Sequence, residues 1–289
     1  MTRNKSFESE DNLLYLVATP IGNMSEVSER TLTVLRESDA IAAEDTRNTG
    51  SLLSKLGISK ELFSLREHNE NEASEHVIKL IKEGKKVAYV SDAGYPGISD
   101  PGYLLVQNAL KEGIRVSTVS GPCAFINALV ASGLETDHFY FHGFLPPKDG
   151  EAKKELEELK NRKETLIFYE SPHRINRMLC NLNEVLGDRK AVIARELTKI
   201  NEEYIRGTLT ELIQIDEATL KGEMVVLVEG NKNKPVITNE KVKERVGYYM
   251  ERGYSKKQAA ELVSQELDVP KNQVKKLIMV DDCPQEELN

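Results

Sequence analysis

A twelve-residue segment of this chain has the composition of a loop that binds a small polar molecule. Residues 91–102 contain three glycines and two prolines. Glycine lets the backbone approach a ligand without an intervening side chain, and proline restricts the backbone of a turn. A flat, polar cofactor could therefore lie directly against the main-chain amides and carbonyls of this segment. An ordinary tight turn is the alternative, although a turn needs only about two such residues.

A second candidate loop, residues 19–23, follows an apolar run near the amino terminus. It lacks the Gly-x-Gly-x-x-Gly pattern that brings a helix terminus to the pyrophosphate of a dinucleotide. The chain also lacks the Gly-x-x-x-x-Gly-Lys-Ser/Thr pattern of nucleotide hydrolases. The sequence therefore favours neither dinucleotide binding nor phosphoryl transfer.

Both loops follow predicted strands. From Leu13 onward, short apolar or β-branched runs alternate with amphipathic segments, which is typical of βαβ units and a mostly parallel sheet. A helix with Pro122 in its first turn should end near Gly133. Ligands of open α/β sheets bind beyond the carboxyl ends of the strands, where both loops lie. The strands predicted for this half are 13–18, 40–43, 62–65, 87–90 and 116–119.

A second strand and helix pattern begins at residue 139. Its predicted strands are 139–145, 165–169, 191–196, 203–206 and 223–228, of which the third and fourth should pair antiparallel. Helices are expected over 151–162, after Pro172 and near 209–214. A linker over 231–235 then precedes helices over 240–252, 255–267 and 272–279, and Ser255 is expected to cap the second of these. The last two helices resemble a helix-turn-helix.

The length of 289 residues suggests about two domains of ordinary size. The patterns divide the chain further: we expect a disordered tail over 1–12, an α/β domain over 13–135, a second α/β domain over 136–231 and a small helical domain over 232–289. The fold class is therefore α/β with a helical addition.

The formal net charge of -8 argues against indiscriminate binding to nucleic acid, because the averaged field repels phosphates. An RNA partner must therefore be bound by a local patch. Residues 240–280 contain nine lysines and arginines against six carboxylates. A solvated helix face explains this mild bias as well as a binding surface does.

The three cysteines are widely separated and form no Cys-x-x-Cys or Cys/His cluster, so neither a disulfide framework nor a metal site is indicated. No apolar run approaches the roughly 20 residues of a membrane span, and the first residues lack the apolar core of a signal peptide. We therefore expect a cytoplasmic protein without a membrane partner.

Several short motifs occur in a fixed order along the chain. They include Thr-Pro-Ile-Gly-Asn at 19–23, Ala-Glu-Asp-Thr-Arg at 43–47 and the segments 68–70, 91–102, 120–122, 169–174 and 194–199. Together they resemble the ribosomal RNA small subunit methyltransferase I family, a branch of the tetrapyrrole methylase superfamily. The resemblance covers about residues 13–230, and the carboxy-terminal helices are similar to the small extra domain of that family.

The resemblance implies two α/β domains with a cleft between them that binds S-adenosylmethionine. It implies methylation of the ribose 2′-hydroxyl of a cytidine in the decoding region of small-subunit (16S) rRNA. It also implies that the enzyme is a homodimer, that DNA is not a partner and that the reaction requires no metal ion. The cofactor surface implied by the motifs spans the segments 19–23, 92–100, 120–123, 168–169 and 222–224. Within these segments the cofactor contacts are assigned to Thr19, Pro20, Ile21, Gly22, Asp92, Ala93, Gly94, Pro96, Gly97, Ile98, Ser120, Pro122, Phe168, Tyr169, Gly222, Glu223 and Met224. Tyr95 stands where much of the family has a small residue.

Methyl transfer to a hydroxyl needs positioning, desolvation and an acceptor for the hydroxyl proton. The candidate acceptors are Glu44, Asp45, His68, Asp100 and Glu196, and Arg47 and Arg195 could hold phosphate bidentately. Structural alternatives stay open for three of these positions. Asp45 could be a helix cap beside the surface cation Arg47, Glu196 could pair internally with Arg195, and His68 could be a structural histidine.

Two other functions are compatible with the same residues. One is a superfamily methyltransferase that acts on a tetrapyrrole or a protein side chain. The other is a ribosome assembly factor without catalysis. The carboxy-terminal helices and the Glu44–Arg47 set favour RNA as the substrate.

Overall fold

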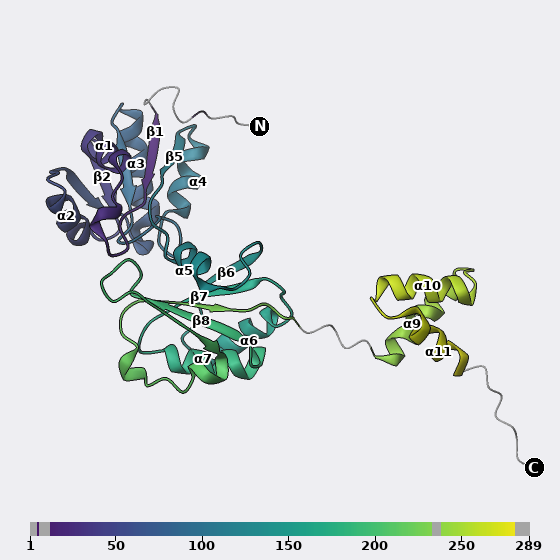
Figure 1. The fold of residues 1–289 in the computed structure, drawn as a ribbon. Coiled ribbons are helices and arrows are strands. Elements are labelled where there is room, and N and C mark those ends of the chain that lie inside the picture. The colour runs from purple at the N-terminus through teal and green to yellow at the C-terminus, as the bar shows by residue number, and fades with distance from the viewer. Residues whose placement is uncertain (1–4, 6–11, 233–237, 281–289) are drawn as a thin grey trace, which may run out of the picture. The chain divides into compact units, whose positions relative to one another are not determined.

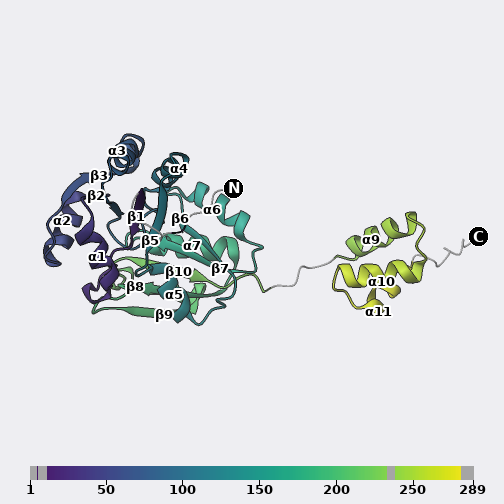
Figure 2. The same ribbon diagram turned by 90° about the horizontal axis from the view of Figure 1, so that it is seen from above.

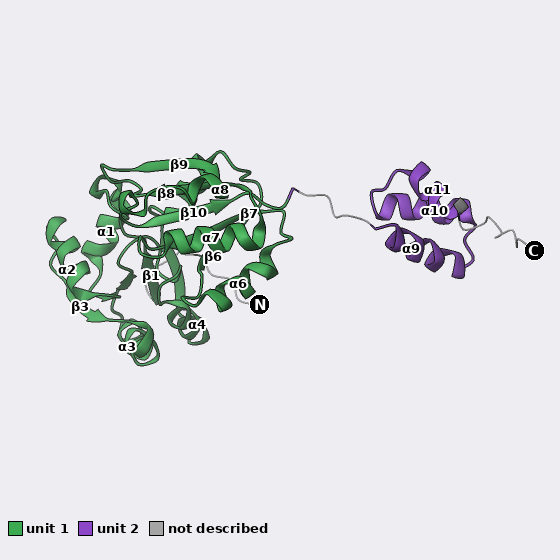
Figure 3. Cartoon of the chain, turned by 90° about the horizontal axis from the view of Figure 1, so that it is seen from below, with its two compact units in different colours: residues 1–231 green, residues 232–289 purple. Residues whose placement is uncertain are grey.

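The computed structural model describes residue 5 and residues 12–232 and 238–280. The chain divides into two compact units, residues 1–231 and residues 232–289 (Figure 3). Most of the tail predicted over 1–12 and of the linker predicted over 231–235 lies outside the described residues. The four-part domain division stays a prediction.

The first unit begins with a parallel five-stranded sheet. Its strands are β1 (Leu13–Val17), β2 (Ala40–Ala43), β3 (Glu61–Ser64), β4 (Val87–Val90) and β5 (Arg115–Val119), in the order β3-β2-β4-β1-β5. Helices α1 (Glu29–Glu37) and α2 (Thr46–Lys55) cover one face, and α3 (Glu70–Lys82) and α4 (Tyr103–Lys111) cover the other (Figure 1). Because both faces are covered, β2 and β4 are buried along their whole length.

A second five-stranded sheet follows in the same unit. Its strands are β6 (Phe139–Phe144), β7 (Thr165–Glu170), β8 (Lys190–Arg195), β9 (Glu203–Thr208) and β10 (Met224–Val228), in the order β6-β7-β10-β8-β9 (Figure 2). Only β6 and β7 pair in parallel, and the other neighbours pair antiparallel. The mostly parallel sheet expected for the first half is therefore confirmed. The antiparallel pairing expected for the third and fourth strands of the second half is confirmed too, because β8 and β9 pair antiparallel across a short connection.

Alternate residues of the second sheet belong to different cores. Phe168 faces the side covered by α6 (Asp149–Leu159), α7 (Ile175–Leu186) and α8 (Leu209–Leu212), whereas Ile167 faces α5 (Ala124–Ser132). Helix α5 precedes the boundary predicted at residue 135, yet it packs on β7, β8 and β10. The chain thus crosses to the second sheet one helix earlier than its pattern indicates.

The predicted strands agree with the structure to within one or two residues. Pro122 is a correction, because α5 begins at Ala124 and its N-cap, Cys123, has an extended φ of -140°. Pro122 therefore lies just outside the helix instead of in its first turn. Gly133 ends α5 in the left-handed conformation at φ 83°, as the sequence predicted.

The second unit consists of α9 (Asn239–Glu251), α10 (Lys256–Glu266) and α11 (Lys271–Val280) around a core of valines and alanines. Ser255 caps α10 in a capping box with Gln258, as predicted. Among the residues that the structure describes, no helix has the length and apolar character needed to cross a membrane, and no cluster of side chains is suited to hold a metal ion.

One buried carboxylate organises the start of α4. Glu70, which is 7% exposed, accepts hydrogen bonds from the main-chain amides of Gly102, Leu104 and Leu105 at 2.8, 2.9 and 3.3 Å. These are helix-terminal amides that lack a partner within their own helix. A negative charge at that position also complements the helix dipole. Glu70 therefore anchors the carboxyl end of the 91–102 loop.

We expect Glu70→Ala to lower the free energy of unfolding by about 3 kcal/mol, because three buried donors lose their acceptor. Urea denaturation measures the change, with the exposed Glu72→Ala on the same helix as the control. Equal stability of the two variants would contradict the anchoring role of Glu70.

Candidate functional site

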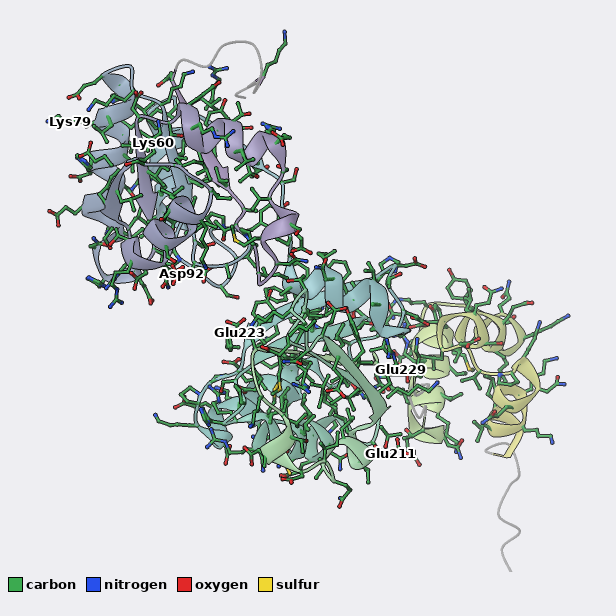
Figure 4. The ribbon with its side chains drawn as sticks, turned by 60° about the vertical axis from the view of Figure 1, so that its left-hand side comes forward. Lys60, Lys79, Asp92, Glu211, Glu223 and Glu229 are labelled. Atoms are coloured by element: carbon green, nitrogen blue, oxygen red, sulfur yellow. The ribbon has the colours of Figure 1, made fainter. Side chains whose placement is uncertain are left out.

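A pocket of about 290 Å³ lies where loops of the first sheet meet the second sheet. Eight of the predicted site residues line it: Ile21, Ala93, Gly94, Ile98, Asp100, Tyr169, Glu223 and Met224. Figure 4 shows Asp92 and Glu223 on the facing edges of the two halves of the unit. Segments that are more than a hundred residues apart in sequence thus form one site.

A main-chain bridge joins the two glycine- and proline-containing loops. Thr19 and Gly94 exchange hydrogen bonds of 2.9 and 3.0 Å through their amides and carbonyls, and the buried Thr19 hydroxyl donates to the Ser91 carbonyl at 3.2 Å. The bridge fixes the 19–23 loop against the 91–102 loop. Thr19 therefore positions the pocket wall instead of facing the cavity.

Tyr95 connects a third loop to these two. Its hydroxyl accepts a hydrogen bond from the Gly121 amide at 3.2 Å, and the ring lines the pocket. Gly121 is itself packed closely on β1, since an added Cβ would lie 2.9 Å from the Cβ of Ala18. Tyr95 thus holds the 120–123 turn against the 91–102 loop.

The opposite wall is largely aromatic and aliphatic. The rings of Phe144 and Tyr169 lie 5.5 Å apart, and Met224 and Val225 are almost fully buried beside them. The buried carboxylate of Glu170 lies at one side, where it accepts from the Ser171 amide at 2.7 Å. The pocket therefore presents flat apolar faces together with a few carboxylates, a combination that suits a ring system joined to a cationic group.

Several predicted residues lie near the pocket without lining it: Thr19, Pro20, Gly22, Asp92, Pro96, Gly97, Ser120, Pro122, Phe168 and Gly222. The Phe168 side chain is fully buried in the core on the other face of the sheet and does not reach the pocket. Asp92 turns its carboxylate to the Asp45 amide and the Asn48 side chain, at 3.2 and 2.6 Å. Gly22 and Gly222 make room for the Lys199 and Glu196 side chains, which an added Cβ would meet.

The candidate proton acceptors separate clearly in the structure. Asp100 is the one that lines the pocket. Glu44 lies behind it and accepts from the Asp92 amide at 3.2 Å. Glu196 pairs with Lys199 at 2.9 Å, and Arg195 pairs with Glu203 at 2.6 Å, so the alternative in which Glu196 pairs with Arg195 is not the one that forms.

Asp45 is a helix cap, which is the structural alternative that the sequence left open. Asp45 caps α2 by accepting from the Arg47 amide at 2.9 Å, and its carboxylate pairs with the side chains of Arg47 and Arg66 at 2.6 and 3.5 Å. Hydrogen bonds from Arg47 lower the pKa of Asp45 well below its usual range. Asp45 is thus a poor proton acceptor and a good holder of two arginines. His68 is exposed in the short helix Glu67–Asn69 and does not line the pocket.

Tyr95, Ser99 and Cys123 also line the pocket and lie within the segments predicted for the cofactor surface. Sequence reasoning did not assign pocket roles to Ala124, Phe144, Glu170, Ser171, Pro172, Leu197 and Val225. A usable signal existed for Glu170, Ser171 and Pro172, which belong to the 169–174 motif. The remaining ones depend on how the second sheet approaches the loops, and no local pattern reports that.

The electrostatics of the pocket centre on Asp100. Burial, followed by the nearby negative charge of Glu44, raises the pKa of Asp100 to about 7, against an opposing hydrogen bond from Ser91. Burial also raises the pKa of Glu44. A carboxyl group with a pKa close to neutrality can accept a proton and release it again at the pH of the cell.

The sequence of the chain is similar to a known protein family and to individual proteins of known name. The profile of the family Tetrapyrrole (Corrin/Porphyrin) Methylases matches residues 13–213. The chain is 45% identical over 284 residues to "Ribosomal RNA small subunit methyltransferase I" of Halalkalibacterium halodurans, covering 95% of this chain and 98% of that protein. It is 42% identical over 283 residues to the Bacillus subtilis protein of the same name, covering 95% and 97%.

Solved structures show the same fold at low sequence identity. The methyltransferase CobJ aligns with a TM-score of 0.58 at 19% identity, covering 78% of this chain and 96% of that one. Cobalt precorrin-4 methyltransferase aligns with a TM-score of 0.54 at 18% identity, covering 75% and 95%. The predicted fold class, two α/β halves with a cofactor cleft and a helical addition, is confirmed.

The raised pKa of Asp100 predicts a pH-dependent stability. Between its ordinary value of 3.8 and about 7, the folded state keeps a proton that the unfolded chain has released. This contribution to stability is present at low pH and is lost as the pH rises through about 7. Between about pH 5 and 8, this effect should lower the free energy of unfolding of the wild type by about 1–2 kcal/mol, after allowance for solvent screening. Asp100→Asn has no carboxyl group to ionise at this position, so we expect its free energy of unfolding not to show that loss.

Denaturant unfolding at a series of pH values measures this difference, with the exposed Asp137→Asn as a control. If Asp100→Asn and wild type lose stability in parallel over that range, the carboxyl group ionises normally and the electrostatic argument fails.

Proposed function

Because this chain belongs to the tetrapyrrole methylase family and, within it, to the ribosomal RNA small subunit methyltransferase I proteins, we propose that it methylates the ribose 2′-hydroxyl of a cytidine in the decoding region of small-subunit rRNA. The chain is an S-adenosylmethionine-dependent rRNA methyltransferase. The corrin enzymes among the structural neighbours share its fold at under 20% identity, so they carry no argument for a tetrapyrrole substrate.

The pocket fits the cofactor on three counts. Its aromatic and aliphatic wall, with Tyr169 and Met224, suits the flat adenine ring. The carboxylate of Glu223, whose side chain is 82% exposed, suits the cationic parts of the molecule. Gly94 leaves its backbone open at φ 77°, where a side chain would be strained. Bound there, S-adenosylmethionine supplies a methyl group on a sulfonium centre.

The residues of the chain position the reactants and exclude water. Leu197, 6% exposed, and the buried Val225 close the apolar side, and the bridge between Thr19 and Gly94 keeps the loops from moving apart. Such pre-organisation lowers the barrier because less orientation and solvent reorganisation remain to be done in the reaction. The protein's direct chemical task is then the removal of one proton.

The observation that carries the proposal is the position of Asp100 in the pocket with a pKa near 7. Of the candidate acceptors, it alone lines the cavity among the described residues, whereas Asp45 and Glu196 are held in ion pairs. We assign to Asp100 the acceptance of the proton from the 2′-hydroxyl. Its neighbour Glu44 keeps the pKa high enough for that step, since its charge disfavours ionisation of Asp100.

Arg47 and Arg66 can bind the phosphates of the substrate strand. Both reach the Asp45 carboxylate, and the side chain of Arg47 is 84% exposed. Paired arginines offer planar, bidentate contacts to phosphate oxygens. Asp45 thus orders two cations beside the pocket, in a chain whose net charge is -8.

We also propose a cytoplasmic homodimer. Apolar side chains support the dimer, since Ile126 and Val130 on α5 are 38% and 69% exposed, and Phe139 at the start of β6 is 41% exposed. Apolar groups gathered on one element commonly mark a protein contact.

The reaction is tested by incubating the protein with labelled S-adenosylmethionine and small ribosomal subunits from cells that lack the modification. Nuclease digestion and mass spectrometry then locate the label. We expect label on a single cytidine ribose. Tight cofactor binding without label in RNA would contradict the proposed substrate and return attention to a tetrapyrrole, a protein or an assembly role.

Asp100→Asn should lower kcat by about 100- to 10,000-fold, because a general base contributes about that much, while the cofactor Kd stays within about threefold. Wild-type kcat should rise with pH through about 7, as Asp100 loses its proton.

The matched comparison is Glu44→Gln, which lies behind the pocket and should reduce kcat much less. It should also shift the rising limb of the pH profile to lower pH, because the charge that raises the pKa of Asp100 is gone. Retained activity of Asp100→Asn, together with loss of activity in Glu44→Gln, would reverse the assignment.

A further inference from the structure

Three side chains on one side of α9 form a stack in the second unit. The Arg252 guanidinium lies 3.5 Å from the centre of the Tyr248 ring, and the Arg245 guanidinium lies 4.3 Å from the same ring. The spacing of three and four residues places all of them on neighbouring turns of the helix. Residues 245, 248 and 252 are called the α9 stack here.

The α9 stack is held in place by its neighbours. Glu266 of α10 pairs with Arg245 at 2.6 Å and accepts from the Tyr249 hydroxyl at 3.0 Å. The Tyr249 ring in turn meets Tyr248 and Tyr254 edge to face, with centroids 5.3 and 5.8 Å apart. The Tyr248 ring and the Arg245 guanidinium are therefore ordered before any partner binds, which reduces the entropy lost on binding.

The core of the second unit is formed without the rings of Tyr248 and Tyr254. That core consists of valines and alanines such as Val246, Ala259 and Val263. Tyr248 and Tyr254 are nevertheless 38% and 45% exposed, and Met250 between them is 38% exposed. Large apolar groups gathered in this way on so small a unit mark a surface that binds something.

The three helices of this unit have a mild basic bias, although the unit as a whole is nearly neutral. Residues 240–280 carry nine basic side chains against six acidic ones, and residues 232–289 carry eleven against ten, in a chain whose net charge is -8. In the described part of the chain, Arg252 has no carboxylate partner, and its guanidinium donates one hydrogen bond, to the Tyr248 carbonyl at 3.3 Å. A flat cation with free donors, beside exposed rings, matches a polyanion that has flat bases.

We infer that the α9 stack, extended by Tyr254, is a surface on which unpaired bases of the rRNA substrate stack. Bases stack on aromatic rings and on guanidinium planes, and this mode needs no fixed sequence. The free donors of Arg252 would bind the adjacent phosphate. This inference rests on the proposed rRNA substrate and adds a second contact to it, outside the unit that holds the pocket.

A second copy of this chain is a weaker fit to the same surface. A symmetric contact would place each α9 stack against its own image, and so bring Arg252 close to the Arg252 of the other copy. Like charges in such a contact are unfavourable. RNA offers opposite charge and flat faces together.

The test uses the full-length chain and the double variant Tyr248→Ala/Arg252→Ala. We expect its KM for small subunits, and its Kd for a fluorescein-labelled single-stranded oligoribonucleotide of about 12 nucleotides, to rise about tenfold, as for the loss of one stacked base. The kcat at saturating subunits and the cofactor Kd should stay at wild-type values. Tyr248→Phe keeps the ring face and should bind like wild type, and Lys276→Ala controls for the loss of one positive charge on another helix of the unit.

Unchanged RNA affinity in the double variant overturns the inference. So does a loss of affinity that Lys276→Ala reproduces in full, because charge alone would then explain it. Sedimentation that shows a shift from dimer to monomer, with RNA affinity intact, would assign the surface to a second copy. If the wild-type chain methylates no rRNA at all, the proposed function fails first, whereas methylation by wild type with no change in the variant refutes the stack alone.

Discussion

The pocket of this protein depends on how the main-chain amides of one glycine-rich loop are satisfied. Residues 91–102 leave β4 and must enter α4 without regular pairing of their own. The structure supplies two outside partners: Thr19 bridges Gly94, and the buried Glu70 carboxylate accepts from three amides at the start of α4. Buried polar groups left without partners are costly, so these contacts determine where the loop can lie. The cavity walls follow from that position.

The same loop places a carboxyl group where ionisation is unfavourable. Asp100 is half-buried beside Glu44, and the raised pKa of Asp100 records the cost. A fold selected for stability alone would pair such a group with a cation, as it does with Asp45 and its arginines. The uncompensated burial of Asp100 supports its proposed role as the proton acceptor, whereas the two ion pairs of Asp45 support a structural role.

The two units differ in the chemistry of their surfaces. The first holds the pocket and, beside it, two arginines ordered by an acidic side chain, while the second exposes rings and a guanidinium on α9. An acidic protein cannot rely on its overall field to attract RNA. Local cations and stacking planes at separate places give several weak contacts, which together select a folded RNA surface over RNA in general.

Local patterns in the sequence determined the elements and the loops. Strand positions, the cap at Ser255 and the glycine that ends α5 depend on neighbouring residues, and they were predictable for that reason. The motifs also indicated the cofactor, the reaction and most of the segments around the pocket. The tertiary structure alone decided that α5 packs on the second sheet, that β10 lies between β7 and β8 in this sheet, and that Asp100 lines the cavity while Phe168 turns away from it. These outcomes depend on contacts between distant segments and on the loss of solvent around a side chain, which no stretch of sequence contains by itself.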